Sequence, residues 1–118
     1  MANKINVIKK NLDFINVNKN GKTYKSNSLI LKKLLYKNLD NSFRIGFTVT
    51  KRLGNAVKRN RAKRIMRELV RRKIIKCGKY NFLYVLIAKK AIFDTPFKNL
   101  EKEFEELLSK KWDLYLKL

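Results

Sequence analysis

Arginine and lysine are the side chains best suited to chemistry in this chain, and they concentrate between residues 51 and 79. This stretch holds thirteen Lys or Arg residues and one acidic residue, Glu68, a local net charge of +12. The guanidinium group presents five N–H donors in a planar fork that fits phosphate oxygens and base edges. Apolar residues recur between the charges, unlike in a disordered basic tail. The pattern predicts a helix that packs on a core and lies along nucleic acid.

A helical wheel separates an apolar side from a basic side in this segment. Ala62, Ile65, Leu69 and Val70 fall within about 100° of Met66, and we expect this side to pack on a sheet. The opposite side consists of Asn60, Arg61, Arg64, Arg67, Arg71 and Arg72, with Arg59 and Lys63 at its flank. A solvated charged face, the alternative interpretation, normally mixes charges of both signs. We therefore interpret the basic side as a binding surface.

A second anion site is predicted at the start of the basic helix. Gly54 turns the chain, and Asn55 is a suitable N-cap. Free backbone N–H groups at a helix N-terminus attract anions, and Lys51 and Arg52 come directly before them.

The sequence argues against catalysis by the protein itself. It contains no histidine and one cysteine, Cys77, so the commonest general base, a disulfide and a zinc site are all excluded. The acidic residues of the last helix are expected on its solvated side: Glu101, Glu103, Glu105 and Glu106. We expect no catalytic residue and no metal site in the protein. No apolar run approaches a membrane span, so a cytoplasmic protein without a membrane partner is expected.

The remaining elements are predicted from periodicity and turn residues. In chain order we expect a helix at residues 10–17, strands at 22–26, 28–36 and 43–50, the basic helix at about 55–76, a strand at 80–88, and a last helix after an N-cap at Thr95 and a first-turn Pro96. Segment 28–36 would suit a helix equally well. Gly21 is predicted as a left-handed C-cap, Gly78 as a helix stop and residues 38–42 as a turn.

This order, αβββαβα, predicts an α/β fold with a four-stranded sheet. The continuous apolar run 82–87 indicates a strand buried on both faces. The chain of 118 residues, 45% of them hydrophobic, is long enough for one domain with its own core, so residues 1–118 are expected to form a single RNA-binding domain despite a net charge of +21.

Seventeen residues of the basic segment resemble the signature of a known family. The run Lys51-Arg-Leu-Gly-Asn-Ala-Val-x-Arg-Asn-Arg-x-Lys-Arg-x-x-Arg67 is similar to that of the bacterial ribonuclease P protein subunit. The resemblance continues in Lys10-Asn-x-Asp-Phe14, in Arg44-Ile-Gly-x-x-Val49, in Ile87-Ala-Lys-Lys-Ala91 and in the amphipathic last helix. It therefore covers nearly the whole chain.

The resemblance implies both a fold and a function. The family folds as a two-layer α/β domain of the ribosomal S5 domain 2-like type, with a left-handed β-α-β crossover that departs from the usual hand. Its members assist a catalytic RNA that cleaves precursor tRNA at the 5′ end of the mature sequence. The holoenzyme is then an endoribonuclease whose chemistry the RNA carries, using Mg²⁺ held mainly by RNA phosphates and none bound tightly by the protein. One protein per RNA is expected.

The resemblance also assigns residues to two RNA sites. The basic helix would dock on the catalytic RNA, and a cleft between the first helix and the sheet would hold the single-stranded 5′ leader of the precursor. The catalytic-RNA set is Lys51, Arg52, Asn55, Arg59, Asn60, Arg61, Lys63, Arg64, Arg67 and Arg71. The leader set is Lys10, Phe14, Lys32 and Arg44.

The expected leader cleft departs from the family pattern at two positions. Asn18 and Lys32 stand where relatives often have aromatic side chains. Tyr36 follows Lys32 by four residues. Leader binding is therefore expected to depend more on charge than on stacking, with Phe14 as the aromatic that could stack on a base. From spacing alone, Phe14 fits equally well in the core.

Two other classes of protein stay open. A structural ribosomal protein is the alternative, because that fold type and charge occur there too. A DNA-binding helix module fits less well, since nothing in the sequence resembles a helix-turn-helix pair.

Overall fold

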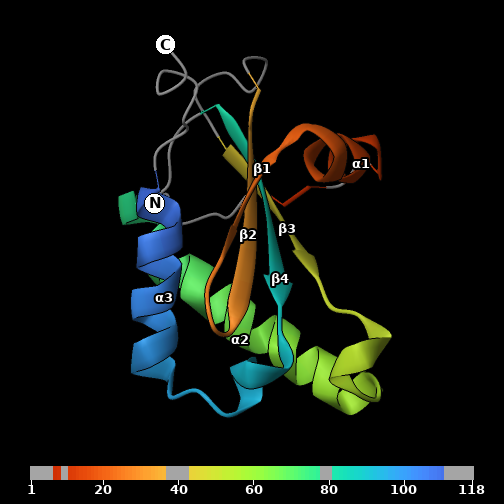
Figure 1. The fold of residues 1–118 in the computed structure, drawn as a ribbon, viewed down its shortest axis with the longest axis vertical. Coiled ribbons are helices and arrows are strands. Elements are labelled where there is room, and N and C mark those ends of the chain that lie inside the picture. Colours follow the sequence, from red (N-terminus) through yellow and green to blue (C-terminus); the bar gives the residue numbers. More distant parts are fainter. Residues whose placement is uncertain (1–6, 9–10, 37–42, 78–80, 111–118) are drawn as a thin grey trace.

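The structure, a computed structural model, describes residues 7–8, 11–36, 43–77 and 81–110. Its elements are α1 (Asn11–Asn20), β1 (Lys22–Lys25), β2 (Leu29–Leu35), β3 (Phe43–Thr48), α2 (Ala56–Cys77), β4 (Phe82–Ala88) and α3 (Phe97–Ser109), with short 3₁₀ turns η2 (Lys51–Leu53) and η3 (Lys90–Phe93) (Figure 1). The predicted order αβββαβα is confirmed, including the strand at the ambiguous segment 28–36.

One four-stranded sheet in the order β1-β2-β4-β3 organises the fold. The pairs β1–β2 and β2–β4 are antiparallel, whereas β3 and β4 are parallel. The parallel pair is joined through α2, which lies behind the sheet in Figure 1, and this crossover is left-handed. The segment at Val7 and Ile8 continues the sheet beyond β3, since the Ile8 N–H donates to the Ile45 carbonyl at 3.0 Å.

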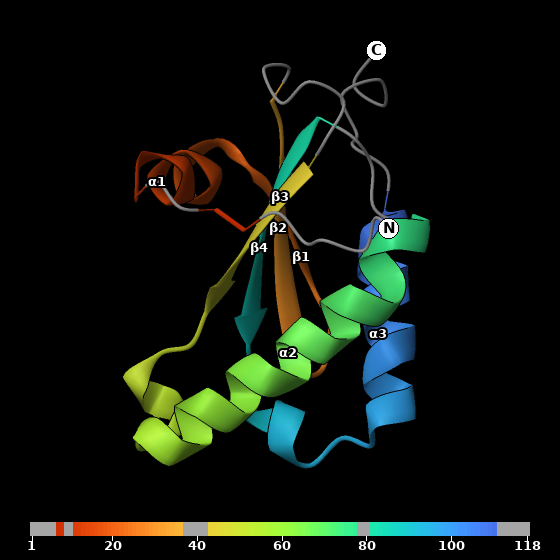
Figure 2. The ribbon, with the colours of Figure 1, turned by 180° about the vertical axis from the view of Figure 1, so that it is seen from behind.

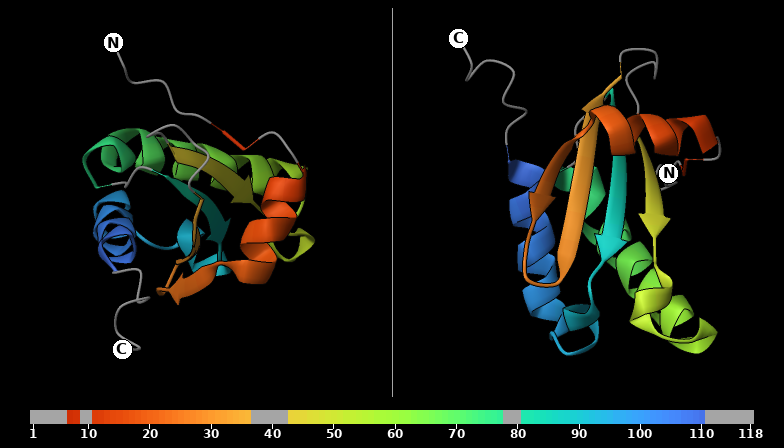
Figure 3. Two further views of the ribbon diagram at one scale, coloured as in Figure 1. Left: turned by 90° about the horizontal axis from the view of Figure 1, so that it is seen from above. Right: turned by 45° about the vertical axis from the view of Figure 1, so that its right-hand side comes forward.

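The helices cover the two faces of the sheet unequally. Figures 2 and 3 show α2 and α3 together on one face and α1 alone on the other, over one end of the strands. The larger core cluster lies between the sheet and α2/α3, and the smaller one lies under α1. Strand β4 is central and almost wholly buried, as its continuous apolar run predicted. No helix among the described residues is long and apolar enough to span a membrane.

Helix α3 packs against the sheet through its predicted apolar stripe. Leu100, Phe104, Leu107 and Leu108 are buried and Phe97 is partly buried. Such a stripe recurs every three to four residues, which places it on one side of a helix.

Two polar contacts that the sequence did not reveal also hold α3. The buried Lys33 Nζ donates to the carbonyl oxygens of Leu108 at 2.9 Å and Lys110 at 2.7 Å, which satisfies the helix C-terminus. Glu103 accepts hydrogen bonds from the Ser26 hydroxyl at 2.6 Å and the Ser28 N–H at 2.8 Å.

Two cap predictions are wrong in part. Gly21 follows the last residue of α1 and its N–H donates to the Val17 carbonyl at 2.9 Å, but it lacks the predicted left-handed conformation, which Gly54 alone has among the described glycines. Gly21 is needed for space instead, because a Cβ there would lie 2.6 Å from the Val17 carbonyl oxygen. Pro96 rather than Thr95 occupies the N-cap position of α3, and the Thr95 hydroxyl donates to the Ala91 carbonyl. The predicted turn at 38–42, the stop at Gly78 and the leader residue Lys10 lie outside the described residues.

Candidate nucleic-acid interface

The buried side of α2 follows the predicted helical wheel. Ala62, Met66, Leu69 and Val70 are all 0% exposed, and Ile65 is partly buried. These residues belong to the cluster between the sheet and the helices. Their burial fixes the rotation of α2, so the basic side lies outside this core, and Figure 2 shows α2 on the outer surface of the sheet.

Arg64 and Arg67 are the arginines of α2 that remain available to a ligand. Both are exposed, and neither forms a hydrogen bond, ion pair or ring contact with the described residues. Their neighbours are partly engaged: Arg59 Nη1 donates to the Gly54 carbonyl at 2.8 Å, and the Arg61 guanidinium lies 5.9 Å from the Phe93 ring centroid. Arg64 and Arg67 are one turn apart and lie on the same side of the helix.

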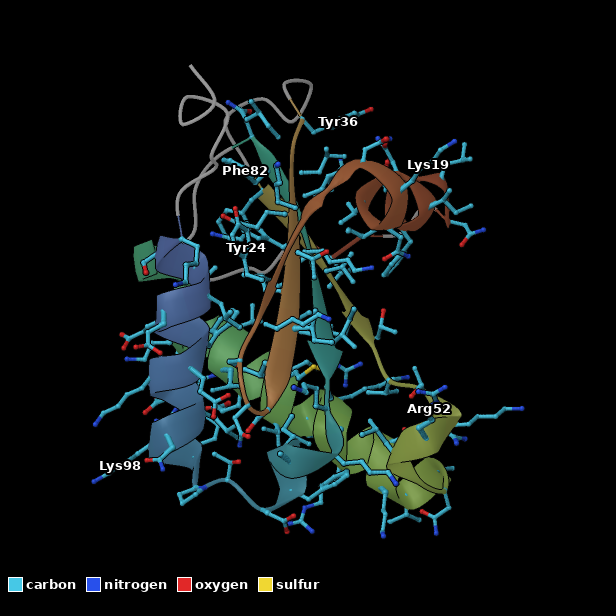
Figure 4. The ribbon with its side chains drawn as sticks, viewed as in Figure 1. Lys19, Tyr24, Tyr36, Arg52, Phe82 and Lys98 are labelled. Atoms are coloured by element: carbon cyan, nitrogen blue, oxygen red, sulfur yellow. The ribbon has the colours of Figure 1, made fainter. Side chains whose placement is uncertain are left out.

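The start of α2 has the predicted cap. The Asn55 Oδ1 accepts a hydrogen bond from the Lys58 N–H at 3.0 Å, and Gly54 turns the chain with φ 130°. Lys51 and Arg52 lie in the turn before the helix and are exposed, and Figure 4 shows Arg52 pointing into solvent. This arrangement places two cations beside the positive end of the helix dipole.

Glu68 provides the counter-charge on α2. Its carboxylate accepts from Arg71 Nε at 3.1 Å and from Arg72 Nε at 2.7 Å, with a further ion pair to Arg71 Nη2. The hydrogen bonds from Arg71 and then Arg72 lower the pKa of Glu68 from 4.5 to about 2. The pKa of each arginine is raised by the same hydrogen bond. Glu68 therefore holds both guanidinium groups in fixed positions.

Arg72 is exposed, as the helical wheel predicted, but it contacts α3. Its Nη1 is 3.6 Å from Glu101 Oε2, and its guanidinium lies 5.1 Å from the Phe97 ring centroid on α3. The wheel placed Arg72 on the basic side, and the packing of α3 against α2 engages it there.

The acidic residues of α3 are mostly engaged rather than solvated. Glu101 pairs with Arg72, Glu103 with two serines, and Glu105 with Lys73 at 3.0 Å. Glu106 is exposed, as predicted.

The opposite face of the sheet brings most of the predicted leader residues together. Lys32 on β2, Val85 on β4 and Gly46 on β3 form one row in the strand register, and Arg44 lies two rows away, on the same face of the sheet. Helix α1 crosses this face, and Phe14 projects from α1 onto Gly46: a Cβ at Gly46 would lie 2.4 Å from the Phe14 ring. Because Gly46 has no side chain, it leaves the space that this half-buried ring occupies.

The two predicted leader cations within the described residues, Lys32 and Arg44, each have a partner on α1. Lys32 Nζ donates to Asn18 Oδ1 at 3.2 Å, so the two positions that depart from the family pattern bind each other. Arg44 Nη1 is 3.8 Å from Asp13 Oδ2, a contact that the sequence analysis did not foresee.

Tyr36 packs against the same small core cluster as Phe14. It also lines a hollow of about 430 Å³ together with residues of α1, including Leu12, Ile15 and Lys19. Of the apolar residues predicted for the first helix, only Val17 is fully buried.

The left-handed crossover and the basic helix define the class as an α/β protein with a strongly basic surface helix, and comparison with known proteins specifies the family. The family model described as Ribonuclease P matches residues 2–112. The ribonuclease P protein component of Clostridium botulinum (strain Loch Maree / Type A3) is 36% identical over 107 residues, 91% of this chain and 95% of that protein. That of Clostridioides difficile (strain 630) is 32% identical over 108 residues, 92% of this chain and 93% of that protein.

Solved structures agree with this result. The RNase P protein of Staphylococcus aureus superimposes with a TM-score of 0.72 at 30% identity, covering 89% of this chain and 94% of that one. The RNase P protein of Thermotoga maritima has a TM-score of 0.75 at 24% identity, covering 86% of this chain and 94% of that one, and supports the fold. The chain belongs to the bacterial ribonuclease P protein family.

Proposed function

We propose that this chain is the protein subunit of RNase P, binding the catalytic RNA through α2 and the 5′ leader of precursor tRNA through the face of the sheet that α1 crosses. It would thereby promote the cleavage that yields the mature 5′ end of tRNA. The observation that carries the proposal is the pair Arg64 and Arg67, exposed and without an acidic partner among the described residues, on a helix anchored in the core of a chain of this family.

The remaining catalytic-RNA residues extend this surface along α2. Those proposed with Arg64 and Arg67 are Lys51, Arg52, Asn55, Arg59, Asn60, Arg61, Lys63 and Arg71. Phosphate contacts by these groups release counterions, which favours docking and makes it dependent on salt. With a net charge of +21, the protein also reduces the repulsion between catalytic RNA and substrate.

Leader binding is proposed for Lys10, Phe14, Lys32 and Arg44. The half-buried Phe14 ring rests on Gly46, which shares a row of the sheet with Lys32 across Val85, so a base and a phosphate of one strand could be bound on the same face. Lys32 and Arg44 are already oriented by Asn18 and Asp13, which lowers the entropic cost of holding them toward the leader.

We assign the hydrolytic chemistry to the RNA subunit. Mg²⁺ activates water and stabilises a leaving oxygen in such reactions. The described residues include no group of three or more side chains that could hold it, and Glu68, Glu101, Glu103 and Glu105 already bind arginine, lysine or serine groups. The proposal therefore leaves Mg²⁺ with RNA phosphates and gives the protein the tasks of binding and orientation. We further propose that one protein binds each catalytic RNA and that the complex is located in the cytoplasm.

Reconstitution tests the proposal. Catalytic RNA of this family is mixed with the purified protein and a precursor tRNA at low Mg²⁺, and cleavage at the mature 5′ end is followed. We expect the protein to increase the cleavage rate and to form a complex with the mass of one protein per RNA. A protein that binds ribosomal RNA better and leaves cleavage unchanged would support the structural ribosomal alternative instead.

A further inference from the structure

A hollow of about 320 Å³ lies between α2 and the edge of the sheet. It is lined by Val7, Phe47, Arg64, Arg67, Glu68 and Arg71. Phe47 is a partly buried residue of β3, at one end of the strand order, and Val7 comes from the segment paired beside that strand and is 43% exposed. The hollow therefore has apolar side chains on its sheet side and charged side chains on its helix side.

The charged side is built from one stripe of α2. Arg64, Arg67 and Arg71 recur at a spacing of three and four residues, so they lie above one another on the helix. Arg71 donates to Glu68 through two of its guanidinium nitrogens, and these hydrogen bonds hold its side chain in one position at the side of the hollow. Arg64 and Arg67 have no such partner among the described residues, so their donors remain free for an anion.

We propose that this hollow receives one unpaired nucleotide of the catalytic RNA, with its base against Phe47 and Val7 and its phosphate on Arg64 and Arg67. This inference rests on the proposed function and adds the class of ligand at one point of the RNA face.

The chemistry of the lining selects this ligand. A phosphate of a paired strand would need the arginines but not the apolar side chains. An apolar peptide would use Phe47 and Val7 but would leave the arginine donors unsatisfied. A single nucleotide offers both a flat ring and an anion, and bases displaced from a helix are commonly stacked on aromatic rings and guanidinium planes. The volume is at the small end of the range for ligand pockets, about 300–1,000 Å³, which suits one nucleotide.

The test replaces the ring while keeping its apolar character. Phe47→Leu is compared with Phe97→Leu, a matched control at another partly buried phenylalanine of the same core cluster, located on α3. Affinity for full-length catalytic RNA is measured over a range of salt concentrations. The reactivity of unpaired bases toward a base-modifying reagent is mapped at saturating protein.

We expect Phe47→Leu to weaken binding by at least about fivefold, the lower limit for loss of a base stack, without changing the salt dependence. An unpaired base of the catalytic RNA that the natural protein protects should become reactive in the variant. Phe97→Leu should change neither property. Should Phe47→Leu prove unstable, Val7→Trp, which fills the hollow from an exposed position, is expected to remove the same protection.

Unchanged affinity and unchanged base protection in both hollow variants would overturn the inference. Protection found on the precursor tRNA instead would overturn the assignment to the catalytic RNA. The double variant Arg64→Ala/Arg67→Ala separates these results from a failure of the proposed function. If it weakens RNA binding while the hollow variants do not, α2 still binds RNA and only the nucleotide site is wrong.

Discussion

Arg64 and Arg67 differ from the other described arginines of α2 in having no hydrogen bond, ion pair or ring contact within the described part of the chain. The others are oriented by the Gly54 carbonyl, by Phe93 or by Glu68. An unengaged guanidinium can form bidentate hydrogen bonds with phosphate without first breaking a protein contact. These two residues should therefore contribute most to RNA binding per side chain.

Replacing both residues provides the first prediction. Arg64→Ala/Arg67→Ala is expected to weaken binding to the catalytic RNA and to lower the slope of log affinity against log salt by about 1.4–1.8, since each lost phosphate contact contributes about 0.7–0.9. The matched control is Lys98→Ala/Lys102→Ala, which removes the same charge from exposed positions of α3. Figure 4 shows Lys98 on the side of the molecule away from Arg52. Equal losses in the two variants would mean that only net charge matters.

The contact between Phe14 and Gly46 gives a second prediction at this scale. Gly46→Ala should lower the free energy of unfolding by about 1–3 kcal/mol, because the new methyl group overlaps the ring. In a Phe14→Ala background the same substitution should cost much less, since the space is then free. Chemical denaturation of the four proteins of this double-mutant cycle measures the coupling. Additive effects would show that the ring does not rest on Gly46.

At the scale of elements, α2 acts as both a core helix and a binding surface. Its buried stripe carries the packing, so its stability can be tested apart from RNA binding. Leu69→Ala is expected to lower the free energy of unfolding by about 2–5 kcal/mol, because Leu69 is 0% exposed. Val57→Ala, on the same helix but 76% exposed, should change it by less than about 0.5 kcal/mol. Thermal or denaturant unfolding distinguishes the two, and similar effects would mean that the buried side is misplaced.

Glu68 makes part of the stability dependent on pH. Its pKa is about 2 in the folded protein against an ordinary value of 4.5. A carboxyl group with a lowered folded pKa stabilises the fold above its unfolded pKa and loses this contribution as the pH falls toward the folded value. Glu68→Gln should therefore be less stable than the natural chain near neutral pH, and the difference should shrink between pH 4.5 and about 2. Unfolding experiments across this pH window measure the difference in stability. A difference that stays constant would contradict the assignment.

Most elements could be predicted from the sequence because their signals are local. The alternation in 43–49, the continuous apolar run in 82–87 and the wheel of α2 each determine a buried side without tertiary information. Segment 28–36 could not be decided locally, since only pairing with β1 and β4 makes it a strand. The buried Lys33, the pair of Asp13 with Arg44 and the contact of Arg72 with α3 each join residues distant in sequence. The hollow beside Phe47 was missed for the same reason.

At the scale of the whole molecule, the two proposed RNA sites lie on opposite faces of one sheet. Helix α2 covers one face and α1 the other, as the views from above and from the side show (Figure 3). Strand β4 between them is almost wholly buried and is hydrogen-bonded to β2 and β3 along its length, so a substitution at one site need not disturb the other. The catalytic RNA and the leader can therefore be bound at the same time, and their contributions can be separated.

The most direct test is the rate of precursor tRNA cleavage by reconstituted holoenzyme, measured against protein concentration and against leader length. We expect Arg64→Ala/Arg67→Ala to raise the protein concentration needed for activity while keeping the dependence on leader length. Phe14→Ala should leave the protein requirement unchanged but weaken precursor binding by about five- to 150-fold for long leaders, with a loss that disappears as the leader is shortened. If both variants changed the protein requirement and the leader dependence alike, the assignment of two separate RNA sites would be contradicted.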